Sequence, residues 1–211
     1  MGKALTQALQ KEQVAVTILM ALIFPMAFYA TDIYMSGQFL QGRSLWNPAL
    51  KWDTLIPFVP EWIWIYLLYF PICFLPITFR ELWMDIGIFR KTVAGFGFQF
   101  VVAMTFFWLL PSQMSRPSSE FSDLGRRVLG WFYTLDPGFN IFPSLHVANT
   151  SFISCLTWRI RGSLSGFLVW MICIFIAVSA LFVKQHYLLD LPAGLFLGIF
   201  SYRLAFSGKV R

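Results

Sequence analysis

The sequence has little charge and few of the residues that bind metals or form disulfides. Only 12% of its 211 residues are charged and 58% are hydrophobic, whereas soluble domains carry about 25% charged residues. Its three cysteines, Cys73, Cys155 and Cys173, lie in apolar segments without paired spacing, which excludes a disulfide framework and a cysteine metal site. No basic run is interleaved with aromatics, so we expect no nucleic-acid partner. These absences predict an integral membrane protein.

Apolar segments recur along the chain, and a crossing helix needs about 20 such residues. The candidate spans are 14–30, 61–79, 92–110, 144–158, 164–183 and about 186–206. Residues 31–60 place tryptophans beside charges and are expected to lie at the headgroup level. We therefore predict an all-α integral membrane protein of six transmembrane helices plus short interfacial helices. Residues 1–211 would form a single membrane-embedded domain.

The longest polar stretch, residues 111–142, contains apolar residues at helical spacing between positions 121 and 132. Ser119 can cap a helix there, and Asp123 would lie in its first turns. This pattern predicts a short amphipathic helix on the membrane surface. A solvated cover over the helix ends would give the same pattern.

The last forty residues contain a compact polar group. Apart from Arg203, only Lys184, His186 and Asp190 can carry a full charge between positions 164 and 206. Such a charge costs roughly 2.5–3.5 kcal/mol at bilayer depth, so it usually has a partner or a function. If this segment is helical, Asp190 can accept the N–H of His186 and leave the other ring nitrogen free as a base or nucleophile. A histidine merely satisfied by its neighbour is the structural alternative.

The other histidine lies in a second polar stretch. Pro143 suits a first helical turn and Ser144 can cap a helix that begins beside it. The free N–H groups at such a helix start form an anion site. His146 would then lie in the first turn of that helix. If His146 and His186 share a membrane face, they can act as acid and base on either side of one phosphoryl group.

The basic residues predict the orientation. One face of a six-span arrangement carries ten of the sixteen: Lys3, Lys11, Arg80, Arg90, Lys91, Arg159, Arg161, Arg203, Lys209 and Arg211. The other face carries six: Arg43, Lys51, Arg116, Arg126, Arg127 and Lys184. The positive-inside rule places both termini in the cytoplasm and the two histidines on the extracytoplasmic face. We expect a multi-pass plasma (cell inner) membrane protein.

These residues resemble the type-2 phosphatidic acid phosphatase superfamily of membrane enzymes. Its second motif, Pro-Ser-Gly-His, appears as Pro143-Ser144-Leu145-His146, a form similar to that of the inositol phosphorylceramide synthase branch. Its third, Ser-Arg-x5-His-x3-Asp, keeps His186 and Asp190 but has Ala180 in place of arginine.

The first motif of the superfamily, Lys-x6-Arg-Pro, is represented by Arg116-Pro117, with Leu109 in place of its lysine. The motif-bearing core therefore covers about residues 109–206. Because the third motif lacks its arginine, Lys184 is the candidate for that phosphate contact.

The resemblance implies a role for each matching residue. His186 would attack phosphorus and become a phosphohistidine, Asp190 would orient it, and His146 would be the general acid and later the base. The phosphate-binding groups would be Lys184, Arg116 and the N–H groups near Ser144. No metal and no other cofactor would be required.

These residues predict a lipid phosphate or diphosphate phosphatase. If an alcohol replaces water as the acceptor, the chain is instead a lipid phosphotransferase. Two histidines and an aspartate could also hold iron or zinc, although Arg116 and Lys184 would repel a metal and attract a phosphate. A transporter or scaffold that binds a lipid phosphate without cleaving it is the non-enzymatic alternative.

Overall fold

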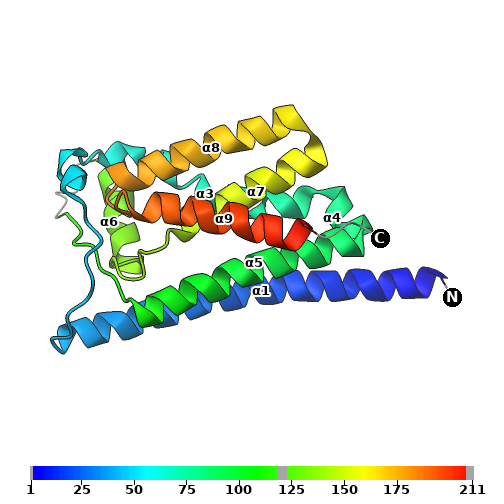
Figure 1. The fold of residues 1–211 in the computed structure, drawn as a ribbon, viewed down its shortest axis with the longest axis horizontal. Helices are drawn as coiled ribbons and strands as arrows, with labels where there is room; N and C mark the ends of the chain where they lie inside the picture. Colours follow the sequence, from blue (N-terminus) through cyan, green and yellow to red (C-terminus); the bar gives the residue numbers. More distant parts are fainter. Residues whose placement is uncertain (1, 118–122, 208–211) are drawn as a thin grey trace.

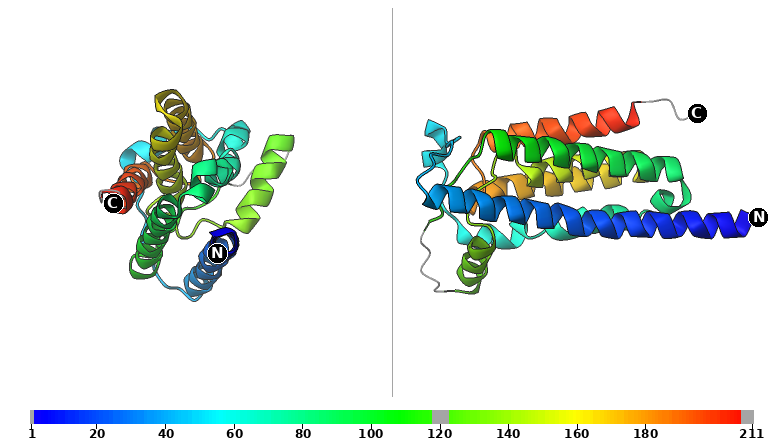
Figure 2. Two further views of the ribbon diagram at one scale, coloured as in Figure 1. Left: turned by 90° about the vertical axis from the view of Figure 1, so that its right-hand side faces the viewer. Right: turned by 90° about the horizontal axis from the view of Figure 1, so that it is seen from below.

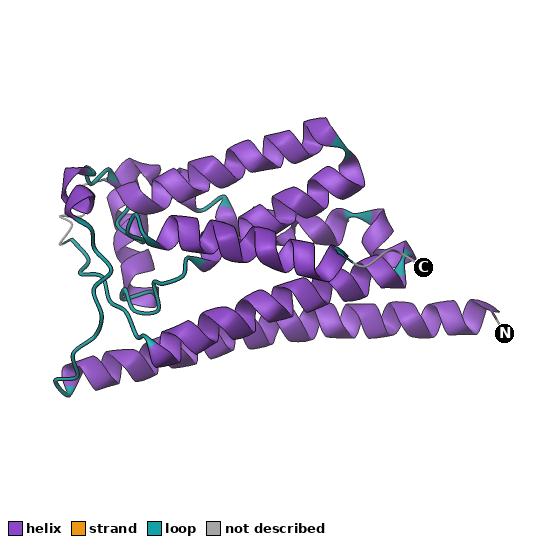
Figure 3. Cartoon of the chain, viewed as in Figure 1, coloured by secondary structure: helices purple, strands orange, loops and turns teal. Residues whose placement is uncertain are grey.

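The computed structural model describes residues 2–117 and 123–207, and no residue in these two ranges belongs to a β-strand (Figure 3). The predicted all-α architecture is confirmed. The longer helices are α1 (Gly2–Leu40), α5 (Ile86–Leu109), α6 (Leu124–Leu135), α7 (Leu145–Arg161), α8 (Ser163–Phe182) and α9 (Asp190–Phe206). All of them except α6 run side by side along the long axis of the molecule, and the start of α1 and the end of α9, the described parts nearest the two termini, lie toward one end (Figures 1 and 2).

The predicted second span, 61–79, is a series of short helices rather than one long helix. They are η2 (Pro60–Trp62), α2 (Ile63–Tyr66), α3 (Tyr69–Phe74) and η3 (Leu75–Thr78), followed by α4 (Arg80–Met84). Proline has no N–H to donate to the carbonyl four residues earlier, and its ring clashes with that carbonyl. Pro71 therefore interrupts the helical hydrogen bonding near Leu67, and Pro76 interrupts it near Ile72.

Within the described residues, four segments are long and apolar enough to cross a membrane: Leu9–Leu40, Pro60–Thr78, Ile86–Leu109 and Ser163–Phe182. The other two predicted spans correspond to α7 and α9, which have 17 residues each. At 1.5 Å per residue each is about 25 Å long, against about 30 Å for a bilayer core. Length and composition thus support four crossings.

The first helix extends well beyond the predicted span 14–30 and includes residues 31–40, which were expected at the headgroup level. It packs on α5 through aromatic pairs, among them Phe24 with Phe100 at a centroid separation of 4.2 Å. Apolar side chains on α1 remain exposed, for example Leu22 at 56% and Met26 at 68%. Such a surface suits contact with lipid.

The amphipathic helix predicted in the polar stretch is α6, which lies across the end of the bundle away from the termini (Figures 1 and 2). Asp123 begins it by accepting the Arg126 backbone N–H at 2.9 Å. The predicted cap, Ser119, lies outside the described residues. Leu129 is fully buried in the core, while Trp131 is 62% exposed.

The central helix, α7, is rich in buried hydroxyl groups. Thr150, Ser154 and Thr157 are buried, and each donates to a carbonyl of the preceding turn at 2.7 Å. Because the helix satisfies its own hydroxyls, these polar side chains can be buried beside apolar ones such as Phe152 and Leu156.

Two glycines allow α9 to approach α7 closely. A Cβ atom on Gly194 would lie 2.4 Å from the Ser144 carbonyl oxygen, and one on Gly198 would lie 2.3 Å from that of Ala148. Small residues four apart are a common way to bring membrane helices together. The contact places the two helix starts side by side, and the Ser144 N–H donates to the Asp190 carbonyl at 3.2 Å.

We expect the Gly198→Ala variant to be less stable, by about 1–3 kcal/mol, because its methyl group would overpack the α7–α9 contact. The measurement is the thermal unfolding midpoint in detergent. Gly97→Ala in α5 is the matched control, since no heavy atom lies within 4 Å of its added Cβ. Equal midpoints for the two variants would contradict close packing of α9 on α7 at Gly198.

Candidate active site

His186 lies in the loop between α8 and α9, not on a helix. The prediction that His186 and Asp190 stack on one helical face is therefore wrong, because α9 begins only at Asp190. The two side chains still meet: His186 Nδ1 lies 3.2 Å from Asp190 Oδ2. The same carboxylate oxygen accepts the Tyr187 backbone N–H at 2.8 Å. Asp190 thus fixes the loop and the ring together.

His146 is the second residue of α7. Ser144 is the N-cap of that helix, as predicted, and its hydroxyl accepts the Val147 N–H. Pro143 precedes the cap instead of occupying the first helical turn, because the helix begins one residue after Ser144. This placement brings His146 Nδ1 to 3.0 Å from His186 Nε2.

A continuous hydrogen-bonded series runs through both rings. Asp190 Oδ2 accepts the Tyr187 backbone N–H, which shows that this oxygen is an acceptor. The contact with His186 Nδ1 is therefore an N–H that donates to the same oxygen. His186 Nε2 is then an acceptor for His146 Nδ1–H. The lone pair on His146 Nε2 in turn accepts the Tyr66 hydroxyl, whose oxygen lies 2.6 Å away. With neutral rings, both histidines therefore carry their proton on Nδ1.

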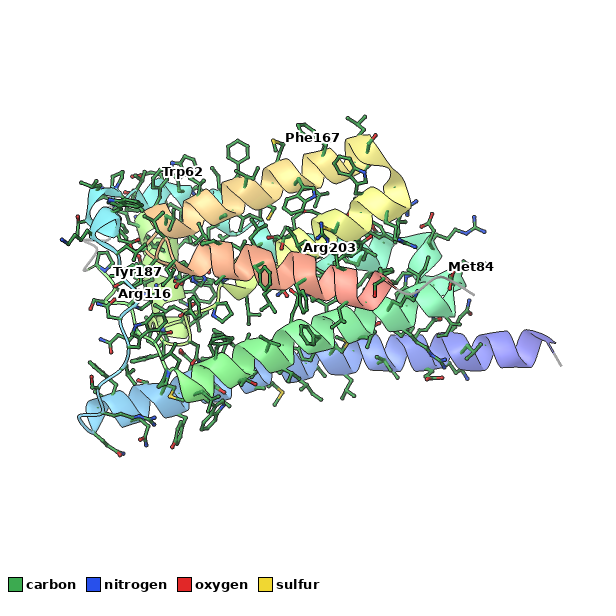
Figure 4. All side chains as sticks on the ribbon, viewed as in Figure 1. Trp62, Met84, Arg116, Phe167, Tyr187 and Arg203 are labelled. Atoms are coloured by element: carbon green, nitrogen blue, oxygen red, sulfur yellow. The ribbon has the colours of Figure 1, made fainter. Side chains whose placement is uncertain are left out.

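Arg116 lies against the residues immediately before His186. Its Nη2 donates to Asp136 Oδ1 at 2.9 Å and to Gln185 Oε1 at 2.8 Å, and its Nη1 contacts the Lys184 carbonyl. Among the described residues, Arg116 Nε and Gln185 Nε2 are buried without a hydrogen-bond partner. Arg116 and Tyr187 lie at the end of the molecule opposite the termini (Figure 4).

The structure does not bring the Lys184 ammonium group to the histidine rings. Lys184 Nζ donates to the Ile56 carbonyl at 2.7 Å, in the segment that contains η1 (Lys51–Leu55). Burial lowers the pKa of Lys184, and the nearby Asp53 carboxylate opposes this change. Asp53 also accepts the Leu188 N–H at 2.8 Å. Residues 51–56 therefore clamp the loop that carries His186.

Sequence reasoning gave no role to two side chains of this site. Tyr66 and Gln185 contact the predicted residues directly. Asp136 was expected to shape the loop before Pro143, and its carboxylate also accepts from Arg116. Gln185 adjoins His186 in the sequence, and that proximity was a usable signal. Tyr66 is 80 residues from His146, and nothing in its own segment distinguishes it from the other aromatic residues there.

The two carboxylates of the site have separate partners: Asp190 contacts His186, and Asp136 contacts Arg116. In the part of the chain that the structure describes, no group of three or more His, Cys, Asp or Glu side chains is placed to hold a metal ion. Chemically, the site offers an oriented imidazole lone pair, a second imidazole beside it and a guanidinium group. These are the elements of acid–base or nucleophilic chemistry on an anion.

Comparison with known proteins is consistent with this arrangement. A family model described as the PAP2 superfamily, the type-2 phosphatidic acid phosphatase superfamily, matches residues 46–204. The match is well over half of the chain and contains both histidines, Asp190 and Arg116. Among curated proteins and solved structures, nothing matches the chain. The chain therefore belongs to the PAP2 superfamily, whose members are generally phosphatases and phosphotransferases.

Proposed function

We propose that this protein is a lipid phosphate or diphosphate phosphatase that acts through a phosphohistidine on His186. The observation that supports this most strongly is the 3.0 Å contact between His146 and His186, with Asp190 on the outer nitrogen of the second ring. This geometry gives the two imidazoles different partners and therefore different roles. Exposed apolar helices beside the site favour a lipid substrate.

The reaction uses only side chains of this chain and water. Entry of the phosphate between the rings replaces their hydrogen bond. His186 Nε2 donates its lone pair to phosphorus and the ester P–O bond breaks. His146, which has taken up a second proton on Nε2 from the substrate monoanion or from solvent, gives its Nδ1 proton to the leaving oxygen. Asp190 stabilises the positive phosphohistidine ring. His146 then removes a proton from water, which attacks phosphorus and releases His186 and phosphate.

The phosphoryl charge needs donors, and the site has several. Arg116 Nε and Gln185 Nε2 are buried donors without a partner among the described residues, so a phosphate oxygen could satisfy both. The start of α7 would add the backbone N–H groups of Leu145 and His146, since those of Ser144 and Val147 already have acceptors. Lys184 would join them only by exchanging its contact with Ile56 for the phosphate. No metal takes part in this scheme.

We propose that α7 and α9 complete a six-span arrangement, with their short ends buried among the other helices. Both termini would then lie in the cytoplasm and the active site at the extracytoplasmic face of the plasma membrane. Met84 lies toward the end of the molecule that carries the termini (Figure 4). The distribution of Lys and Arg supports this orientation.

Transfer to an alcohol is the second candidate, and Leu145 in the second motif favours it. The same phosphohistidine would serve both reactions, because only the acceptor differs. An inositol phosphorylceramide synthase-like enzyme would hold that alcohol where a phosphatase admits water.

The test is to incubate purified protein with phosphatidate, phosphatidylglycerophosphate, an isoprenyl diphosphate and lipid A, with and without alcohol acceptors. We expect free phosphate from at least one lipid, unchanged by a strong chelator. New phospholipid formed only with an alcohol would identify a transferase. Activity lost to the chelator and restored by one metal would contradict metal independence. Binding of these lipids without any turnover would favour the transporter or scaffold.

A further inference from the structure

We infer that Tyr66 is a positioning residue for the reaction: its phenol holds His146 Nε2 and thereby aims the Nδ1 of that ring at the reacting phosphoryl group. The inference rests on the proposed function. The Tyr66 oxygen lies 2.6 Å from His146 Nε2, and the Tyr66 side chain is fully buried. The opposite nitrogen of the ring is the one that faces His186.

A phenol suits a ring that must change its protonation state twice in each cycle. A hydroxyl group is both a donor and an acceptor. In the resting neutral ring, Tyr66 donates to His146 Nε2. When His146 is protonated, Tyr66 rotates its hydrogen away and accepts from Nε2–H, and it keeps accepting after Nδ1 has given its proton to the leaving oxygen. The ring therefore keeps one orientation in both states. An uncharged partner also leaves His146 free to release its proton.

The partner of the other ring has the opposite character. Asp190 is a carboxylate whose Oδ2 only accepts, so it keeps a proton on His186 Nδ1 and leaves Nε2 as the nucleophile. It also stabilises the positive charge that the ring gains on phosphorylation. One carboxylate partner and one phenol partner thus separate the two histidines into nucleophile and acid.

The surroundings of Tyr66 hold its hydroxyl in place. The Phe132 ring of α6 meets the Tyr66 ring edge-on, with centroids 5.3 Å apart and planes at 82°. Ile63 and Leu129 belong to the same buried cluster. The amphipathic helix therefore packs against the residue whose hydroxyl contacts His146.

Tyr69 provides a matched control. Its ring packs against His146 with centroids 4.3 Å apart, but its hydroxyl accepts from Asn149 Nδ2 at 2.8 Å instead of contacting an imidazole nitrogen. Tyr66→Phe and Tyr69→Phe each remove one phenol hydroxyl beside the same histidine. Only the first removes a hydrogen bond to the His146 ring.

The kinetic test compares two phosphate monoesters with hydrocarbon chains of the same length. One has an alkyl leaving group, and the other has a nitrophenyl leaving group that carries the chain on its ring. We expect Tyr66→Phe to lower kcat for the alkyl ester by about 10- to 100-fold, the equivalent of one hydrogen bond to a charged group, with KM unchanged. The first turnover of the nitrophenyl ester should match wild type, because nitrophenolate leaves without a proton. Tyr69→Phe should match wild type on both. A Tyr66→Phe variant equal to wild type, or slowed equally on both esters, would overturn the inference.

A second measurement does not depend on turnover. The chain contains two histidines, so protein labelled with ¹⁵N-histidine and purified without a histidine tag has four ring nitrogens to assign. We expect Tyr66→Phe to shift the His146 Nε2 resonance and Tyr69→Phe to leave it in place. An unchanged resonance would refute the role of Tyr66 even in an active enzyme. If wild type cleaves neither ester, the proposed function fails, while this spectrum still decides the hydrogen bond.

Discussion

Replacing His186 with alanine is expected to reduce phosphate release by about 10⁴-fold or more, because the variant has no nucleophile to form the phosphoenzyme. Wild-type protein given a ³²P-labelled lipid phosphate should acquire a label that is stable to alkali and lost in acid, as phosphohistidine is. The variant should acquire none. Both the rate and the label are measured on the same purified protein in detergent.

The control for His186→Ala is a protein that is folded and still binds. Because Arg116 and the start of α7 remain, the variant should bind a non-hydrolysable phosphonate lipid within a few-fold of wild type, and its unfolding should stay cooperative. A folded His186→Ala protein that releases phosphate at the wild-type rate would rule out the assigned nucleophile.

The His146→Gln variant is expected to lose about 10²- to 10⁴-fold in kcat for an alkyl phosphate, the usual contribution of a general acid–base group. With the matching nitrophenyl phosphate, the leaving group needs no proton, so the first turnover should keep nearly its wild-type rate. Later turnovers should be slow, because His146 is also the base that activates water. The variant should therefore show a burst of nitrophenol equal to the enzyme concentration.

The burst distinguishes a catalytic role of His146 from a purely structural one. A His146 that only supported the fold would slow the alkyl and nitrophenyl esters alike and would give no burst. Stopped-flow absorbance on the nitrophenyl ester distinguishes the two outcomes. Asn149→Ala, one turn along α7, is a suitable control for general damage to this helix.

Much of the site could be anticipated from residue types alone. Two histidines and one carboxylate in apolar surroundings are conspicuous, and the structure brings His146, His186 and Asp190 together. Their catalytic roles stay predictions. The helical stacking of His186 on Asp190 was wrong because the Asp190 side chain accepts the Tyr187 N–H and holds the preceding residues in a loop. Spacing of four cannot distinguish those two geometries.

The remaining contacts depend on distant parts of the chain. Lys184 was expected at the phosphate, yet its ammonium donates to Ile56, 128 residues away. Tyr66 reaches His146 over 80 residues. Such contacts follow from how the loops and helices pack, and no local pattern encodes that. The breaks in the second span, in contrast, depend on local sequence. Pro71 and Pro76 each remove a helical hydrogen bond, so a break near each of them is predictable.

The contact between the two imidazole rings has a consequence for selectivity. His186 Nε2, the proposed nucleophile, is hydrogen-bonded to His146, the proposed acid, so a substrate would first have to separate the two rings. A long hydrocarbon chain can supply that free energy from contacts remote from phosphorus, as enzymes often do. A short-chain ester or a free phosphate ion lacks these remote contacts and the free energy that they supply. The hydrogen bond between the two rings would thus exclude water-soluble phosphates from the site and admit membrane lipids.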